Sequence, residues 1–185
     1  MKKIISFLLI IFFVFQHNLK AQETKESNNL FSFSIPRLFM SNMMFGYERL
    51  FNTTGLVINA GVTLKDNNSE TLTGYNVELQ CRLYPAIHRE SAFQGIYLAP
   101  YVSYKRLDEE LNYTFPGPQK YYYNDYGVGV LFGLKLAIAQ KIVFTYELGG
   151  GLKYSDNNRG STSNIIKPGY TGIAPKADIT LGYFF

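Results

Sequence analysis

The amino-acid sequence predicts an all-β fold: a single closed, antiparallel, up-and-down transmembrane β-barrel of eight strands. Three observations lead to this fold class. Apolar and polar residues alternate with a period of two along much of the chain, long and short connections alternate, and the final segment carries regularly spaced apolar and aromatic residues up to Phe185. Such a sheet must close in hydrocarbon, because an open edge would leave N–H and C=O groups unpaired.

Eight segments carry the strand pattern. The clearest is 75–83, where every odd position is apolar and every even position is polar or charged. Pro36 lies at or near the end of the first segment. The expected strands are 31–37, 42–51, 55–65, 74–84, 95–106, 126–138, 141–154 and 173–185.

Charged residues recur in the middle of these strands and predict a polar interior. Eight strands enclose a lumen that side chains just fill, and buried charges need partners. We therefore expect an ion-pair network of four acids and two bases, with Lys105, Lys153 and Lys176 nearer the outer rim. The expected network is Glu48, Glu78, Arg82, Lys135, Glu147 and Asp178. A soluble barrel would instead face its apolar side inward, and alternation alone leaves that alternative open.

The connections favour the membrane alternative. With the N-terminus on the periplasmic side, the turns expected there are 52–54, 85–94 and 139–140, and those expected outside are 66–73, 107–125 and 155–172. The longest two lie outside and the shortest two inside, as in outer-membrane barrels. Tyrosines near strand ends, at 84, 104, 126 and 154, are expected at the headgroup level.

The connection 107–125 is the candidate recognition surface. Its aromatic residues are Tyr113, Phe115, Tyr121, Tyr122 and Tyr123. Exposed aromatic side chains favour binding to an extracellular protein or a glycan. The alternative is that they stack on each other or lie at the headgroups. Alternation at Leu111, Tyr113 and Phe115 indicates that the hairpin continues above the membrane.

The two ends of the chain point to export. Residues 1–21 have a basic start and an apolar run too short for a membrane span, which is typical of a cleaved signal peptide. Residues 22–30 are expected to form a short N-terminal segment before a barrel over 31–185. Three of the 18 Lys and Arg residues lie in the signal, which leaves 15 against 14 acidic residues. This near-neutral balance gives no support to a nucleic-acid partner.

The last strand resembles the C-terminal assembly signal that the outer-membrane barrel insertion machinery recognises. Ile179, Leu181, Tyr183 and Phe185 carry this likeness. The chain beyond residue 21 resembles the small eight-stranded outer-membrane proteins typified by the OmpA transmembrane domain. It is also similar to an uncharacterised family of Gram-negative outer-membrane barrels, through Tyr47-Glu48-Arg49 and the Gly-Tyr-x-x-Glu-x-x-x-Arg-x-Tyr pattern of 74–84. The resemblance implies an outer-membrane location with lipid as a partner, and no activity.

No catalytic, metal or cofactor site is expected. Two lipid-modifying enzyme families use this barrel size and need a histidine near the outer leaflet, but His88 falls in an expected periplasmic turn. Cys81 is expected to face lipid, and no spacing of His, Cys or carboxylates suits a metal. The sequence favours a non-enzymatic barrel with a structural or surface-interaction role; a narrow channel or small-ligand carrier is the alternative.

Overall fold

The computed structural model describes residues 28–67, 70–85, 95–112, 117, 119–139, 141–160, 162, 164 and 168–185. The expected signal peptide at 1–21 lies outside these residues, as do most of the expected N-terminal segment, His88, Tyr113 and Phe115. Eight strands and one short helix make up the fold. They are β1 (Asn29–Ser34), α2 (Ile35–Phe39), β2 (Asn42–Phe51), β3 (Thr54–Asn67), β4 (Glu70–Leu83), β5 (Gly95–Leu111), β6 (Gln119–Ala139), β7 (Ile142–Asn157) and β8 (Gly172–Phe184).

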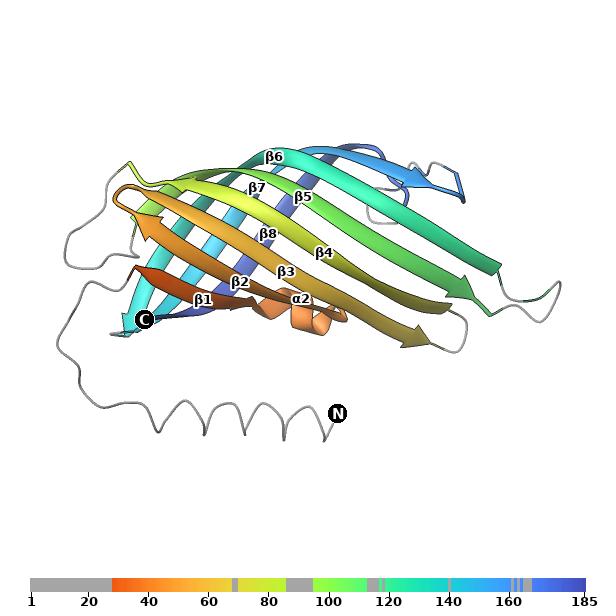
Figure 1. Cartoon of the computed structure of the whole chain (residues 1–185), viewed down its shortest axis with the longest axis horizontal. Helices are drawn as coiled ribbons and strands as arrows, with labels where there is room; N and C mark the ends of the chain where they lie inside the picture. The colour runs from red at the N-terminus through yellow and green to blue at the C-terminus, as the bar shows by residue number, and fades with distance from the viewer. Residues whose placement is uncertain are drawn as a thin grey trace, which may run out of the picture.

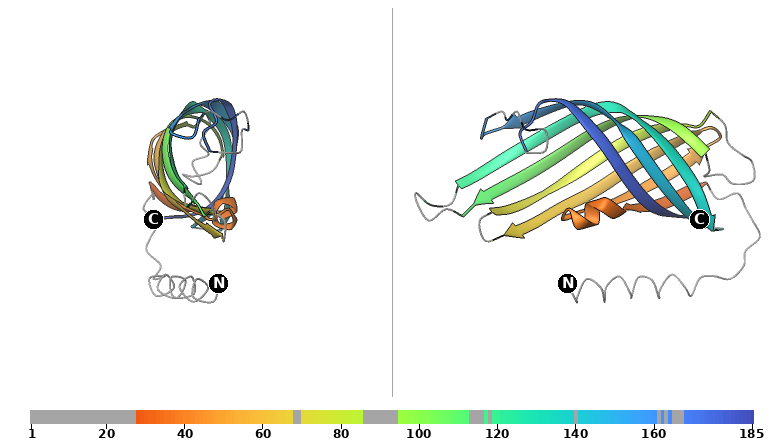
Figure 2. Two further views of the ribbon diagram at one scale, coloured as in Figure 1. Left: turned by 90° about the vertical axis from the view of Figure 1, so that its right-hand side faces the viewer. Right: turned by 180° about the vertical axis from the view of Figure 1, so that it is seen from behind.

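Each strand pairs antiparallel with its neighbours in sequence, and β1 pairs with β8 to close the barrel. Figure 1 shows the strands running obliquely along the barrel, and the end-on view in Figure 2 shows the ring that they form. The end that carries Asn29 and Phe185 is called the termini end, and the opposite end is called the loop end. The predicted fold class, a closed eight-stranded antiparallel barrel, is confirmed.

Three predicted details of the strands are wrong. The strand expected at 31–37 ends at Ser34, because Pro36 starts helix α2, where a missing N–H does not matter. Strand β5 continues to Leu111, and β6 begins at Gln119, so most of the expected connection 107–125 is strand. Only 68–69 separate β3 from β4, which makes that loop-end turn shorter than the 84–94 connection at the termini end.

The barrel is apolar outside and polar inside. Large hydrophobic side chains on the outer face are exposed, among them Leu148 and Leu152 on β7 and Ile173 on β8. Charged side chains on the opposite face are buried, and Lys135 and Glu48 have 0% and 1% of their surface exposed. This arrangement is the reverse of a soluble barrel and suits a hydrocarbon environment.

A belt of outward tyrosines crosses four strands near the loop end. Tyr75, Tyr104, Tyr126 and Tyr154 follow one another on β4, β5, β6 and β7, with successive ring centroids 6.0, 5.3 and 6.4 Å apart. Amphipathic rings of this kind favour the headgroup level of a membrane. Tyr84, expected at the same level, is instead buried inside the barrel, because it occupies an inward position on β4.

The barrel wall is interrupted beside α2. Strand β1 pairs with β8 only over Leu30–Ser34, so among the described residues no strand pairs with the remaining edge of β8, Gly172–Ile179. Likewise, Asn42–Met44 of β2 pair only with β3. Helix α2 lies against β2 and β8 at this place (Figures 1 and 2). We call this stretch of wall the seam.

Candidate functional site: the barrel interior

Glu48 is the hub of an inward ion-pair network. Its carboxylate forms ion pairs with the Arg82 guanidinium and the Lys135 ammonium, and it accepts a hydrogen bond of 2.6 Å from the Tyr84 hydroxyl. All four groups are buried. The residues come from β2, β4 and β6 and from the residue after β4, so one carboxylate joins strands on opposite sides of the wall.

Arg82 links this hub to a second carboxylate, Glu147 on β7. Its Nη2 lies 2.5 Å from Glu147 Oε1, and its Nε donates to Gln80 Oε1 at 2.9 Å. The Tyr97 hydroxyl donates to Glu147 at 2.7 Å, and the guanidinium lies 4.8 Å from the centre of the Tyr97 ring. Every group that could carry charge here therefore has a hydrogen-bond partner, as buried charges require.

Glu78 forms a third unit of the network. Gln80 donates to its carboxylate at 2.9 Å and Asn59 at 3.4 Å, and the Lys176 ammonium of β8 forms an ion pair with it. Lys176 also lies 4.4 Å from the centre of the Tyr101 ring. Lys176 was expected nearer the rim, whereas the pairing register places it opposite Glu78.

Asp178 fixes helix α2 to the barrel. Its carboxylate accepts hydrogen bonds from the Ser34 hydroxyl at 2.5 Å and from Arg37 Nε at 2.9 Å. It also accepts one from the backbone N–H of Ile179 at 2.8 Å, which lies at the unpaired edge of β8. One carboxylate thus both holds α2 in place and satisfies part of the open strand edge.

The six predicted network residues all point inward, but the predicted composition of four acids and two bases is incomplete. Arg37 and Lys176 add two cations, so that each of the four carboxylates has a cationic partner: Glu48 with Arg82 and Lys135, Glu147 with Arg82, Glu78 with Lys176, and Asp178 with Arg37. Arg37 was missed because it was assigned to a strand. The sequence Ser34-Ile35-Pro36, a helix-start pattern, was the available signal.

Apolar and aromatic side chains pack around the network at the termini end. The buried cluster there is Leu30, Leu50, Tyr84, Tyr97, Ala99, Tyr101, Leu131 and Val143. The Tyr84 and Tyr97 rings lie 5.3 Å apart between centroids. Gly133 leaves room for Tyr97, since a Cβ at that position would lie 2.0 Å from the ring. The termini half of the lumen is therefore filled by side chains.

A second cluster lies inside the loop end. Leu107, Leu111 and Tyr123 are buried, and the Tyr123 hydroxyl donates to Glu109 at 2.5 Å. Arg159, just after β7, donates to the same carboxylate at 2.8 and 3.0 Å. Tyr123 lies beyond the tyrosine belt, and burial, with the hydrogen bond to Glu109, raises its pKa to about 12. Arg159 ties the segment after β7 across the loop end.

The predicted recognition residues do not lie together in a loop. Tyr121, Tyr122 and Tyr123 belong to β6, so the prediction of a loop there is wrong. Tyr123 points inward, Tyr122 is exposed, and Tyr121 donates to Gln119 at 2.5 Å and lies under Arg159, whose guanidinium is 4.9 Å from the ring centre.

The C-terminal residues Ile179, Leu181, Tyr183 and Phe185 alternate along β8 and its end. The Phe185 side chain is exposed, while its backbone N–H donates to Asn29 O at 2.9 Å. The chain end is thus hydrogen-bonded to the first described strand.

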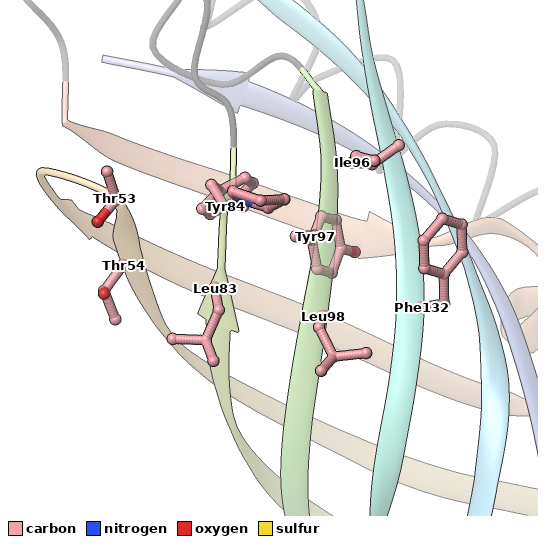
Figure 3. Close-up of a pocket in the computed structure, with 9 residues that line it drawn as sticks. Thr53, Thr54, Leu83, Tyr84, Ile96, Tyr97, Leu98 and Phe132 are labelled. Carbon is pink, nitrogen blue, oxygen red and sulfur yellow. The ribbon is translucent and has the colours of Figure 1, made fainter.

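A shallow groove of about 330 Å³ lies on the outer face near the termini end. Leu83 and Leu98 pair across β4 and β5 in its floor, with Ile96 and Phe132 beside them (Figure 3). These side chains are exposed and apolar. The groove is therefore part of the outward apolar surface.

Within the described residues, no group of three or more His, Cys, Asp or Glu side chains is arranged to hold a metal ion. No helix in the same part of the chain is long and apolar enough to cross a membrane.

The closed barrel, its apolar outer face and its paired interior charges define an outer-membrane-type eight-stranded β-barrel. The chain is similar to CarO of Acinetobacter baumannii, known from a crystal structure, at 14% sequence identity and a TM-score of 0.46, over 89% of this chain and 100% of that one. A likeness at this level does not assign a function. No family model matches the chain, and no curated protein matches it. The resemblances to the OmpA transmembrane domain and to the uncharacterised family stay predictions.

Proposed function

We propose that the protein is an integral outer-membrane barrel that neither conducts ions nor catalyses a reaction, and that its role is structural or lies in surface interaction. The observation that carries the proposal is the filled termini half of the lumen. Arg82, Glu48, Glu147 and Lys135 pair with one another across it, each with at most 5% of its side-chain surface exposed.

The membrane location rests on the outer surface. The apolar outer face carries the tyrosine belt near the loop end, and the inward charges are shielded from it. With the termini end in the periplasm, the long β5–β6 hairpin rises beyond the belt and is the proposed interaction surface. Tyr122 is its exposed aromatic residue, and Arg106 lies 5.7 Å from the centre of that ring. An aromatic ring beside a guanidinium suits a protein or glycan partner.

The first test is the mobility of the protein in SDS gels, unheated against boiled, after extraction from the outer-membrane fraction. We expect a shift on boiling, because a closed barrel keeps its fold in cold detergent. Recovery in the soluble periplasm with no shift would overturn the membrane location.

The second test is single-channel recording in planar bilayers, with protein that shows the gel shift and a porin as positive control. We expect a silent trace. Discrete openings would overturn the non-conducting role and favour the narrow channel. Absence of catalysis predicts that lipid acylation stays unchanged when the gene is deleted, and an altered acylation pattern would contradict it.

A further inference from the structure

A row of inward polar residues crosses four strands in the outer half of the barrel. Asn76 on β4 pairs in register with Lys105 on β5, Lys105 with Asp125 on β6, and Asp125 with Ser155 on β7. Their side chains occupy inward positions on adjacent strands. We call these four residues the polar row.

The polar row has unused hydrogen-bonding capacity. Asn76 Oδ1, Asp125 Oδ1 and Ser155 Oγ are buried and have no hydrogen-bond partner, although each of these residues is more than nine-tenths buried. Buried polar atoms are nearly always satisfied in folded proteins, so unsatisfied ones need an explanation. Two of the three atoms are oxygens that can only accept, and they call for a ligand that donates hydrogen bonds.

The same row carries a cation in excess. Lys153 forms an ion pair of 2.8 Å with Asp125, which leaves Lys105 without an ion pair among the described residues. Lys105 interacts electrostatically with Asp125, Lys153 and Arg37, so it faces two cations and one acid. An anionic group of a ligand would balance this charge.

The seam is the approach to this row from the membrane. Arg37, which interacts with Lys105 inside, belongs to α2, and the next residues of α2 and its end, Leu38, Phe39 and Met40, are exposed outside. The open edge of β8 contains Pro175, a residue that sheets accept at edges. Among the described contacts, the side-chain hydrogen bonds and ion pairs of α2 run to Asp178 alone.

We propose that the polar row binds the headgroup of a phospholipid that carries both an anionic phosphate and N–H donors, namely phosphatidylethanolamine, while its acyl chains stay in the bilayer against α2. The phosphate pairs with Lys105, and the ammonium donates to Asp125 Oδ1. Only the headgroup enters, since an eight-stranded lumen has no room for the chains, and α2 moves aside to admit it. The inference rests on the proposed membrane location and extends beyond the proposed role.

The test uses a tryptophan placed on α2. The sequence contains no tryptophan, so Phe39→Trp gives a single fluorophore at an exposed position. The protein is reconstituted in unlabelled phosphatidylcholine vesicles, and the gel shift confirms insertion first. A small, equal mole fraction of brominated phosphatidylethanolamine or brominated phosphatidylcholine is then added, and quenching of the fluorescence is measured. The two lipids share the phosphate and differ in N–H donors.

We expect brominated phosphatidylethanolamine to quench Phe39→Trp at least twofold more than brominated phosphatidylcholine. Phe132→Trp, on the outer face of β6 away from α2, should show no difference between the lipids. The preference at Phe39→Trp should disappear in the Phe39→Trp/Lys105→Gln variant, which is expected to fold because Lys105 has no ion pair to lose.

Equal quenching by the two lipids at Phe39→Trp would overturn the proposal. A preference that survives Lys105→Gln, or one that also appears at Phe132→Trp, would overturn it as well. None of these results bears on the silent bilayer trace, and an absent gel shift would count against the membrane location alone.

Discussion

Replacement of Arg82 by methionine tests how dry the network is. The Arg82 side chain is 5% exposed, and its partners Glu48 and Glu147 are 2% and 3% exposed. Methionine keeps much of the side-chain length but leaves both carboxylates without the guanidinium. Removal of one partner from a buried ion pair costs about 3–5 kcal/mol, because the charge left behind stays desolvated. We expect a loss near the lower end, since Glu48 keeps Lys135 and Tyr84, and Glu147 keeps Tyr97 and Gln80.

The assay is urea unfolding of the reconstituted barrel, followed by circular dichroism and by the heat-dependent gel shift. A loss of about 3 kcal/mol lowers the ratio of folded to unfolded protein by roughly two orders of magnitude. Lys120→Met is the matched control, because the Lys120–Glu110 pair is 3.2 Å long but largely exposed. That control should lose less than about 1 kcal/mol.

A second substitution sharpens the test. In Arg82→Met/Glu147→Gln, one of the two stranded carboxylates is neutral, so the double variant should lose less stability than the sum of the single variants. If Arg82→Met loses no more than Lys120→Met, the network is hydrated, and the argument for a filled, silent lumen fails.

Three further predictions concern the ends and the seam. Phe185→Ala should lower the heat-shifting fraction in cells several-fold, whereas Phe132→Ala should not, and equal yields would reject the assembly role of the C-terminus. Asp178→Asn should speed amide hydrogen exchange in α2 and at Ile179 by about tenfold or more, because hydrogen bonds to a charged acceptor each contribute roughly 1.5–3 kcal/mol; unchanged protection would show that α2 is held by other contacts. The raised pKa of Tyr123, about 12, means that the stability it contributes is present below pH 10 and is lost as pH rises toward 12. The melting temperature should therefore fall more steeply between pH 10 and 12 in the wild type than in Tyr123→Phe, and parallel curves would contradict this.

The sequence was sufficient for the fold class and for the inward faces of the strands. Alternation sets which side of a strand a residue faces, and this places Glu78 and Arg82 together without any knowledge of the neighbours. The depth of a residue in the barrel depends on the stagger between strands, which alternation does not reveal. Lys176 was therefore placed at the rim, although the register brings it to Glu78.

The seam could not be predicted for a different reason. Helix α2 has five residues, too few for a periodic pattern, and Pro36 was interpreted as a blemish in a strand. The unpaired edge of β8 follows from the early end of β1, which is a property of pairing and not of either sequence segment alone. The tyrosine belt shows the same limit, because the proximity of Tyr84 to a strand end was a weaker guide than its parity on β4.

The way Glu48 joins distant strands bears on how the barrel is built. Its partners reside on β4 and β6, and Arg82 extends the connection to β7, so no single hairpin contains both signs of the charge that it must bury. A half-assembled sheet that entered the bilayer would carry uncompensated Arg82 or Lys135 into hydrocarbon, at about 2–4 kcal/mol for each. Stepwise insertion of hairpins is therefore disfavoured, and the strands are expected to curl into a nearly complete ring before they cross. The network thus acts during biogenesis as a checkpoint on closure.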